Sequence, residues 1–228
     1  MNTLAIIIAC GKEEQITKGT DTAFLTIGSR PVLALSLQTF QKASCVNGII
    51  VVVSKDRVDS ALQVANRFGC TKVCGIVTGS SQRLTSLRAV LAKLPESANT
   101  ILIHEASRPF VSEKTIEACV RATKRYGCAI AAHCIPDAVK LANGLTVKKT
   151  LERHAVWQAQ TPQGFKTALL EKLVDSKNKN IKVIDDESEW IKKPAETHLV
   201  ESGGDQNMKI RTAEDLLKAT AFFHAQNS

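Results

Sequence analysis

Aromatic residues are scarce in this 228-residue chain: Phe, Trp and Tyr make up 4% of it, and Tyr126 is the only tyrosine. Aliphatic side chains must therefore fill the core, as they do in parallel sheets covered by helices on both faces. The scarcity also argues against a platform for single-stranded nucleic acid, on which bases stack against aromatic rings. We expect no nucleic-acid partner.

Long apolar runs and a basic leader are missing too. No run reaches the roughly 18 apolar residues that a membrane-spanning helix needs, and no basic region precedes the apolar run at residues 4–9. The seven cysteines include no CxxC pair, so a reducing compartment without structural zinc is the default expectation. These absences predict a cytoplasmic protein with no membrane partner.

Acidic residues are outnumbered by basic ones. Lys and Arg total 30 against 22 Asp and Glu, which gives a net charge of +8. A basic chain favours an anionic partner, either nucleic acid or a phosphorylated small molecule. The lysines at residues 177–182 form no long basic block, and we interpret them as solvated surface residues.

Apolar, β-branched runs alternate with helical periodicities along the first 132 residues. The runs, each interpreted as a strand, are residues 4–9, 48–53, 72–77, 101–104 and 128–132. Helices of roughly 10–15 residues between them imply βαβ units. We therefore predict an α/β fold with a Rossmann-like, mostly parallel sheet flanked by helices. The length fits one domain over residues 1–228.

Helical patterns dominate after residue 160. Residues 161–165 are expected to lead into a helix that ends near Val174, and residues 197–200 to form a strand. A capping-box-like pattern at Thr212 predicts the last helix. The side chains of this helix expected to face inward are Leu216, Leu217, Thr220 and Phe223.

The alternation breaks between residues 135 and 158. Two short strand patterns flank Asn143-Gly144, a pair that favours the tight turn of a β-hairpin. A hairpin that leaves a compact sheet in this way either covers a site or reaches another subunit.

Polar loops follow the first, third and fourth predicted strands, at residues 10–22, 79–83 and 105–108. Because the carboxyl ends of parallel strands share one edge of a sheet, these loops should converge. Together they offer backbone N–H groups, two helix N-termini, two arginines and one carboxylate. This set suits a metal–triphosphate complex, with cations and amides for the oxygen atoms and a carboxylate for Mg²⁺.

Three charged side chains support that interpretation. Glu105 directly follows a buried strand, where carboxylates commonly serve a site, and Arg83 and Arg108 are the two cations. Two structural alternatives remain open. Arg83 is also compatible with a solvated helix position, and Glu105 with a local ion pair to Arg108.

Several motifs occur in order along the chain. They are Ala9-Cys10-Gly11; Gly79-Ser80-Ser81-Gln82-Arg83 with Ser86; Ile103-His104-Glu105-Ala106-Ser107-Arg108-Pro109-Phe110; Arg153; Trp157-Gln158-Ala159-Gln160-Thr161-Pro162-Gln163; Asp186-Glu187; and Asn207-Met208-Lys209-Ile210. Together they resemble the Ala-Ala-Gly, Gly-Gly-x-x-Arg-x-x-Ser, His-Asp-Ala-Ala-Arg-Pro, Arg, Trp-x-x-x-Thr-Pro-Gln, Thr-Asp-Glu and Asn-x-Lys motifs of the 2-C-methyl-D-erythritol 4-phosphate cytidylyltransferase family. So many ordered matches are specific, whereas Ala-Arg-Pro alone would not be.

The resemblance implies a nucleotidyltransferase of non-mevalonate isoprenoid biosynthesis. It would join CTP to a polyol phosphate, 2-C-methyl-D-erythritol 4-phosphate, and release pyrophosphate, with Mg²⁺ as cofactor. The substrate phosphate would attack the α-phosphorus of CTP in line, while the enzyme positions the groups and neutralises charge. Residues 135–158 resemble the family's dimerisation arm, which implies a homodimer.

The resemblance also implies roles for the matching residues. Glu105 would ligate Mg²⁺ and help to hold the sugar alcohol, whose pocket Arg108 and Thr161 would line. Lys209 and Arg153 would be the catalytic cations that hold the attacking phosphate, with Arg153 carried by the arm towards the neighbouring subunit's site. The nucleotide would be bound by Ala9, Cys10, Gly11, Gly79, Ser80, Arg83, Ser86 and Ala106.

The first loop departs from the family pattern, in which Ala-Ala-Gly-x-Gly-x-Arg continues to Pro-Lys-Gln. Without gaps, Glu13 stands at the second glycine, Gln15 at the arginine and Thr22 at the lysine. The arginine and lysine stabilise charge on the α- and β-phosphates, and one preorganised donor is worth about 3–4 kcal/mol.

Other charges in the same loop bear on this loss. Lys12 and Lys18 would have to compensate for the missing cations. Glu13 and Glu14 would instead repel a triphosphate unless they face solvent. Glu105 stands where the family has aspartate, which lengthens the metal ligand by one methylene.

Two alternatives to the leading hypothesis stay open. One is a catalytically impaired homologue that keeps the dimer scaffold, and the other is a cytidylyltransferase for another polyol phosphate such as ribitol 5-phosphate. A nicotinamide-dependent reductase is disfavoured, because Gly11 has no GxGxxG around it and Ser54-Lys55 ends the second strand where an acidic residue is expected.

Overall fold

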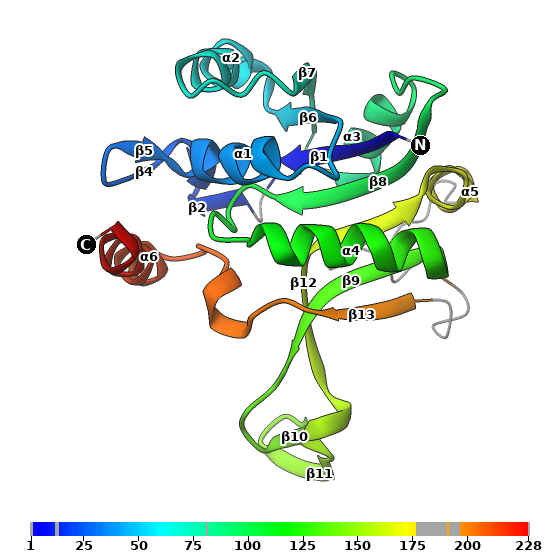
Figure 1. The fold of residues 1–228 in the computed structure, drawn as a ribbon. Coiled ribbons are helices and arrows are strands. Elements are labelled where there is room, and N and C mark those ends of the chain that lie inside the picture. The colour runs from blue at the N-terminus through cyan, green and yellow to red at the C-terminus, as the bar shows by residue number, and fades with distance from the viewer. Residues whose placement is uncertain (1, 12–13, 81, 177–190, 192–196, 228) are drawn as a thin grey trace.

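A seven-stranded sheet forms the centre of the computed structural model, which describes residues 2–11, 14–80, 82–176, 191 and 197–227 (Figure 1). The strand order is β13-β9-β12-β8-β1-β6-β7. The strands are β1 (Asn2–Ile8), β6 (Gly48–Val53), β7 (Val73–Thr78), β8 (Ala98–Glu105), β9 (Cys128–Cys134), β12 (Trp157–Lys166) and β13 (Thr197–Glu201). Neighbouring strands are parallel except for β12, which is antiparallel to β8 and β9. The predicted mostly parallel α/β sheet is confirmed.

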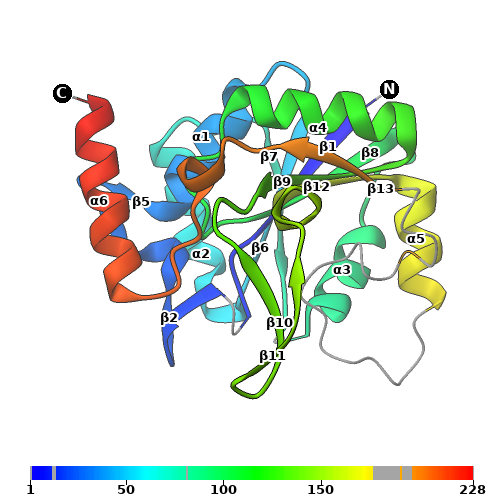
Figure 2. The same cartoon turned by 90° about the horizontal axis from the view of Figure 1, so that it is seen from below.

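Helices cover both faces of this sheet (Figures 1 and 2). They are α1 (Val32–Lys42), α2 (Val58–Arg67), α3 (Arg83–Leu91), α4 (Glu113–Tyr126) and α5 (Thr167–Ser176). The last helix, α6 (Ala213–Asn227), lies beside the sheet and packs against the start of α1. Side chains of α1, α2 and α4 pack with Ala5 and Ile7 of β1, whereas those of α3 and α5 pack with Ile6 and Ile8. Both faces of β1 are therefore buried, which explains its unbroken apolar run. None of the described helices is long and apolar enough to cross a membrane.

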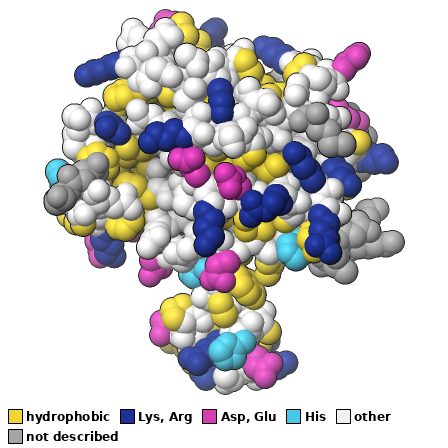
Figure 3. Space-filling model, viewed as in Figure 1, with side chains coloured by type: hydrophobic (Ala, Val, Ile, Leu, Met, Phe, Trp, Pro, Cys, Tyr) yellow, Lys and Arg dark blue, Asp and Glu magenta, His cyan; other side chains and the backbone are white. Residues whose placement is uncertain are grey.

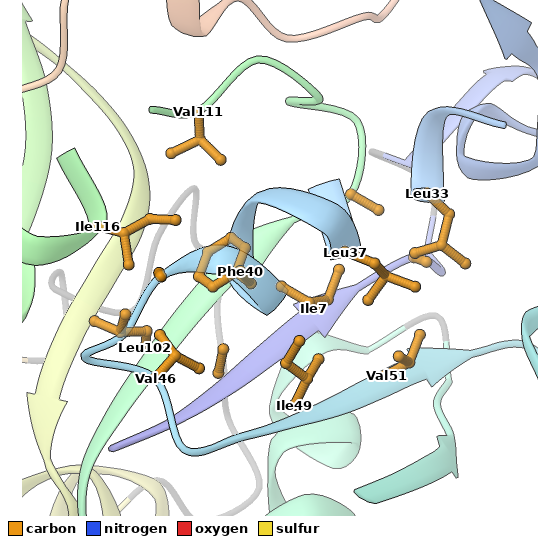
Figure 4. Packing of buried hydrophobic residues seen from close by; sticks show 14 of the residues in the cluster. Ile7, Leu33, Leu37, Phe40, Val46, Ile49, Val51, Leu102, Val111 and Ile116 are labelled. Carbon is orange, nitrogen blue, oxygen red and sulfur yellow. The ribbon is translucent and has the colours of Figure 1, made fainter. Parts of the chain in front are cut away.

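The core on the α1 side of the sheet is shown in Figure 4. Leu33, Leu37 and Phe40 lie on one face of α1 at helical spacing and are fully buried. They pack in one cluster with Ile7 and Ile49 of the central strands. Burying one such side chain contributes about 1.5–3 kcal/mol. This packing holds the central strands, and with them the loops at their carboxyl ends.

Strand β12 was not predicted, since residues 161–165 were expected only to lead into a helix. The strand fills the position between β8 and β9. The strand shows no alternation because residues 160–165 are all buried. Gly164 has no side chain where α4 crosses the strand: a Cβ there would overlap Thr123 Oγ1 and lie 3.2 Å from Leu102 Cδ2. Tertiary packing therefore determines this strand more than local pattern does.

Helix α6 corrects one expected core residue. Leu217 is 72% exposed, so the prediction that it faces inward is wrong. The inward stripe instead runs through Leu216, Ala219 and Phe223, at the three- and four-residue spacing of one helix face. Helix α6 contacts the short strand β4 (Thr26–Ile27), which pairs with β5 (Arg30–Pro31).

The predicted hairpin is present and leaves the body of the molecule. Its strands are β10 (Val139–Asn143) and β11 (Thr146–Leu151), paired antiparallel, and Gly144 turns between them at φ +54°. We call residues 135–158 the arm. Figure 3 shows it projecting, with hydrophobic and charged side chains mixed on its surface. Leu141, Leu145 and Val147 of the arm are exposed.

Candidate active site

The first and fourth loops meet at the carboxyl edge of the sheet, as predicted. The backbone N–H of Ala9 donates to the Val52 carbonyl at 2.8 Å, and that of Ala106 to the Ile8 carbonyl at 2.8 Å. These two bonds continue the parallel ladders past the strand ends. The resemblance assigns Ala9 and Ala106 to nucleotide binding, and both residues lie at the carboxyl end of β1.

Gly79 brings the third loop against the first. A Cβ at this position would collide with Cys10 Sγ and lie 2.7 Å from Val52 Cγ1 and 3.0 Å from Ser86 Oγ. The Ser80 N–H donates to Ser86 Oγ at 2.9 Å, which ties the loop to α3. Only glycine fits this close approach. Burial raises the pKa of the Cys10 thiol to about 11, so it is protonated and is no nucleophile.

Glu105 gathers three cations at the end of β8. Its Oε1 lies 2.7 Å from Lys209 Nζ and 3.5 Å from the Arg83 guanidinium, and its Oε2 accepts from Arg108 Nε at 2.8 Å. Burial on its own would raise the pKa of Glu105, but the charges of Lys209, Arg108 and Arg83 outweigh it and hold that pKa well below its usual range. The alternative of a local ion pair between Glu105 and Arg108 is thus confirmed as part of a larger cluster. The alternative of a solvated Arg83 is wrong, because this residue contacts Glu105.

Asn207 links this cluster to β12, the strand next to β8. The Arg108 guanidinium donates to the Asn207 carbonyl at 3.0 Å. The Asn207 amide donates to Gln160 Oε1 at 2.8 Å and to the Thr161 carbonyl at 2.8 Å. These bonds place Lys209, two residues further on, beside Glu105. The tertiary structure thus joins residues from distant parts of the sequence.

His104 and Thr161 hold the backbone of Glu105 from behind. His104 is fully buried, and burial lowers its pKa to about 3, so the imidazole is neutral. Its Nε2 lies 3.0 Å from the Arg108 carbonyl, which can only accept, so we assign the proton to Nε2. Its Nδ1 then accepts from Thr161 Oγ1 at 2.9 Å, and that hydroxyl accepts from the Glu105 N–H at 3.1 Å. Thr161 is buried, and its hydroxyl supports Glu105.

The loop that departs from the family pattern forms a small hairpin of β2 (Gln15–Thr17) and β3 (Thr20–Asp21). Gln15 donates to Asp21 Oδ1 at 3.1 Å, and Arg57 pairs with Asp21 Oδ2 at 3.1 Å. Thr22 is fully buried, and Lys18 is exposed between the two strands. Gln15 thus has a structural contact, whereas the buried Thr22 hydroxyl has no hydrogen-bond partner among the described residues.

Glu14 is the site residue that the sequence did not predict. Gly11, at φ +104°, turns the chain, and its carbonyl accepts from the Glu14 N–H at 3.1 Å. The Glu14 carboxylate is buried, accepts from both the N–H and the hydroxyl of Ser107, and lies 3.4 Å from Lys209 Nζ. Burial raises its pKa to about 7, with Lys209 opposing and Glu105 reinforcing that shift. No local signal distinguished Glu14 from a solvated acid.

Some predicted residues lie apart from this site or outside the described part of the chain. Arg153 is exposed on the arm, where its guanidinium donates to the Pro136 carbonyl at 3.4 Å. The residues of the motifs and of the altered loop that lie outside the described residues are Lys12, Glu13, Ser81, Asp186 and Glu187, and the lysines at 177–182 lie outside them too. The described site therefore consists of the sheet edge of this chain, without Arg153.

Comparison with known proteins tests the resemblance. The family model for IspD, 2-C-methyl-D-erythritol 4-phosphate cytidylyltransferase, matches residues 3–225. The chain belongs to this family. The enzyme of that name from Geobacillus kaustophilus is 30% identical over 221 residues, which cover 97% of this chain and 96% of the relative. The bifunctional IspD/IspF enzyme of Desulfotalea psychrophila is also 30% identical over 221 residues, but this chain spans only 56% of its length.

Solved structures agree with the family assignment. The 4-diphosphocytidyl-2C-methyl-D-erythritol synthase of Anaerococcus prevotii superposes with a TM-score of 0.86 at 25% identity, over 98% of this chain and 96% of that one. The Rossmann-like fold and the family predicted from the motifs are both confirmed. The altered first loop is therefore a departure within the family.

Proposed function

We propose that this chain transfers the cytidylyl group of CTP to 2-C-methyl-D-erythritol 4-phosphate and releases pyrophosphate. Family membership supports the reaction, and the cluster of Lys209, Arg108 and Arg83 around Glu105 at the sheet edge is the observation that carries it. An oxygen of the polyol phosphate forms a bond to the α-phosphorus, and the bond from that phosphorus to the bridging oxygen breaks. The bridging oxygen leaves with pyrophosphate, so no redox partner is needed.

The protein would contribute position and charge to this step. Lys209 would hold the attacking phosphate, and Arg83, at the first turn of α3 and 3.5 Å from Glu105, would contact the nucleotide. Gly79 lets the third loop pack against Cys10 of the first loop, which would keep the two nucleotide-binding loops together. Thr161 acts through the backbone of Glu105, so we assign it a positioning role.

Mg²⁺ is part of this proposal through Glu105. The chemistry of that donor fits, because its lowered pKa keeps it an ionised carboxylate and Mg²⁺ is commonly held by one or two carboxylates together with substrate phosphates. Three cations already contact the same carboxylate, so the ion would be bound together with the triphosphate. When bound, it would neutralise charge on the phosphate oxygens.

The arm supports a homodimer in the same proposal. Its exposed Leu141, Leu145 and Val147 are an apolar surface outside the compact body, and Arg153 lies on the same excursion. A second copy of the chain would cover this surface and receive Arg153 in its site. The cytoplasmic location expected from the sequence stays a prediction.

Pyrophosphate release tests the function directly. We expect release from CTP and 2-C-methyl-D-erythritol 4-phosphate with Mg²⁺, and a loss of at least 100-fold in kcat/KM, about 2.7 kcal/mol or more, in Lys209→Gln. The matched control is Lys172→Gln, which neutralises an exposed lysine of α5 and should retain full activity.

Two outcomes separate the alternatives. No pyrophosphate release even at high enzyme concentration would reject catalysis and favour the impaired homologue, an outcome worth testing because neither Gln15 nor Thr22 carries a positive charge. Faster release with ribitol 5-phosphate in the same assay would replace the polyol substrate while retaining the reaction.

A further inference from the structure

The carboxylate of Glu14 lies where donors to an anion converge. Its Oε2 accepts from the Ser107 N–H at 3.1 Å, and its Oε1 accepts from the Ser107 hydroxyl at 2.9 Å and lies 3.4 Å from Lys209 Nζ. A backbone N–H, a hydroxyl and an ammonium are the groups that bind phosphate oxygens in proteins. Ser107 and Lys209 therefore form an anion-binding site, and the Glu14 carboxylate occupies it.

The same contact places Lys209 between two carboxylates. Its Nζ is 2.7 Å from Glu105 and 3.4 Å from Glu14, and its side chain is only 5% exposed. When Glu14 is ionised, two negative charges thus face one buried positive charge. Solvent screens such a buried group weakly. The two carboxylates therefore reduce the attraction of Lys209 for an incoming dianion more strongly than they would at the protein surface.

The buried position of Glu14 is electrostatically unfavourable for an ionised carboxylate. Burial penalises its charge, and Glu105 repels it, so its pKa rises to about 7. The desolvation of this buried carboxylate offsets much of its attraction to Lys209, so the contact is weak evidence for a stabilising role. Its charge acts directly on Lys209.

We propose that Glu14 sets the phosphate affinity of this site by competing with a phosphate group for Lys209 and Ser107. The ligand is a phosphate monoester dianion, which is the polyol phosphate if the proposed function holds. The competition itself depends only on charge and donors, and so applies to inorganic phosphate as well. Glu14 is thus a specificity-determining residue that weakens binding of the acceptor phosphate.

Calorimetric titration with inorganic phosphate, without CTP, tests the competition apart from turnover. We expect Glu14→Gln to bind phosphate about 10-fold more tightly than the wild-type chain, because the amide places no negative charge beside Lys209 and its single oxygen can accept from only one of the two Ser107 donors. Glu171→Gln, which neutralises an exposed acid of α5, controls for net charge and should change affinity less than twofold. In a Lys209→Gln background the gain from Glu14→Gln should disappear.

The outcomes separate this inference from the proposed function. Equal or weaker phosphate binding by folded Glu14→Gln overturns the competition and makes Glu14 an anchor of the first loop. If thermal unfolding shows that Glu14→Gln is not folded, Glu14→Asp replaces it, and its retracted carboxylate should give a smaller tightening; no tightening overturns the proposal. Tighter phosphate binding without any pyrophosphate release would uphold the competition and reject the cytidylyltransferase reaction.

Discussion

At the scale of single residues, burial decides which groups of the site carry charge. Glu105 stays ionised because three cations surround it, whereas His104, close behind, is kept neutral by its burial. The neutral imidazole donates to the Arg108 carbonyl and accepts from Thr161. His104 therefore has a structural role: in one fixed tautomer, its two hydrogen bonds hold the end of β8. Acid–base catalysis by His104 is excluded by its position behind the strand end and by its protonation state.

Acid should destabilise the chain through His104. Burial lowers the pKa of His104 to about 3, whereas the unfolded imidazole takes up a proton near pH 6.5. As the pH falls below 6.5, protonation stabilises the unfolded state by up to about 1.4 kcal/mol per pH unit. Urea unfolding of the wild-type chain and of His104→Gln measures this effect, since all other titrating groups are shared.

The stability advantage of the wild-type chain over His104→Gln should shrink by roughly 1.5 kcal/mol between pH 6.5 and pH 5. An advantage that stays constant over this range would mean that His104 is already protonated in the folded chain. The variant can fold because its amide can still donate to the Arg108 carbonyl.

At the scale of elements, the contact between α4 and β12 fixes the strand that the sequence did not predict. Gly164 of β12 lies directly under Thr123, whose buried hydroxyl donates to the Cys119 carbonyl at 2.7 Å. Because α4 cannot approach the sheet if β12 carries a side chain there, this glycine sets the distance between the two layers. The same strand continues to Thr161 and so connects helix packing to the site.

Gly164→Ala should destabilise the chain by about 1–3 kcal/mol, the usual cost of overpacking a core. Gly75→Ala in β7 is the matched control, because a Cβ there would meet only Ile50 Cγ1 at 3.9 Å, an ordinary contact. Alanine at position 75 should leave stability unchanged or raise it slightly. Urea midpoints of both variants against the wild-type chain decide the matter. Equal midpoints would show that α4 can shift without cost.

At the scale of the whole molecule, the arm projects from the compact body (Figures 1 and 3). Arg153 belongs to the arm, whereas Glu105, Arg108 and Lys209 form the cluster at the sheet edge. If the arm joins two protomers, each site would be completed by the other copy. The function would then depend on assembly as well as on folding.

Mixing two inactive variants tests this arrangement. We expect Arg153→Gln and Lys209→Gln each to lose activity as homodimers. After unfolding and refolding together, about half of the dimers should be heterodimers with one intact site, restoring about a quarter of wild-type activity. No recovery in a mixture that sedimentation shows to be dimeric would place Arg153 outside the partner's site, and a monomeric wild-type chain would reject the homodimer.

The sequence by itself determined the five strands with apolar, β-branched runs, the helices between them, the hairpin and the family. Each of these depends on local periodicity or on short ordered motifs: β6 begins and ends where its β-branched run does, and Ser112 caps α4 by accepting from the Thr115 N–H. The charged residues of the loops after β7 and β8 were likewise found from sequence, because parallel strands place their carboxyl ends at one edge.

Only the tertiary structure decided where Glu14, Leu217 and strand β12 lie. Glu14 meets Ser107 across 93 positions of sequence, and no local pattern encodes a contact between two such distant loops. Leu217 is exposed because the stripe of α6 that meets the body is set by the neighbouring helix and strands, while the helical period alone allows either face. Burial of a charge depends on every group packed around it, and that is why the charge balance at Lys209 became visible only in three dimensions.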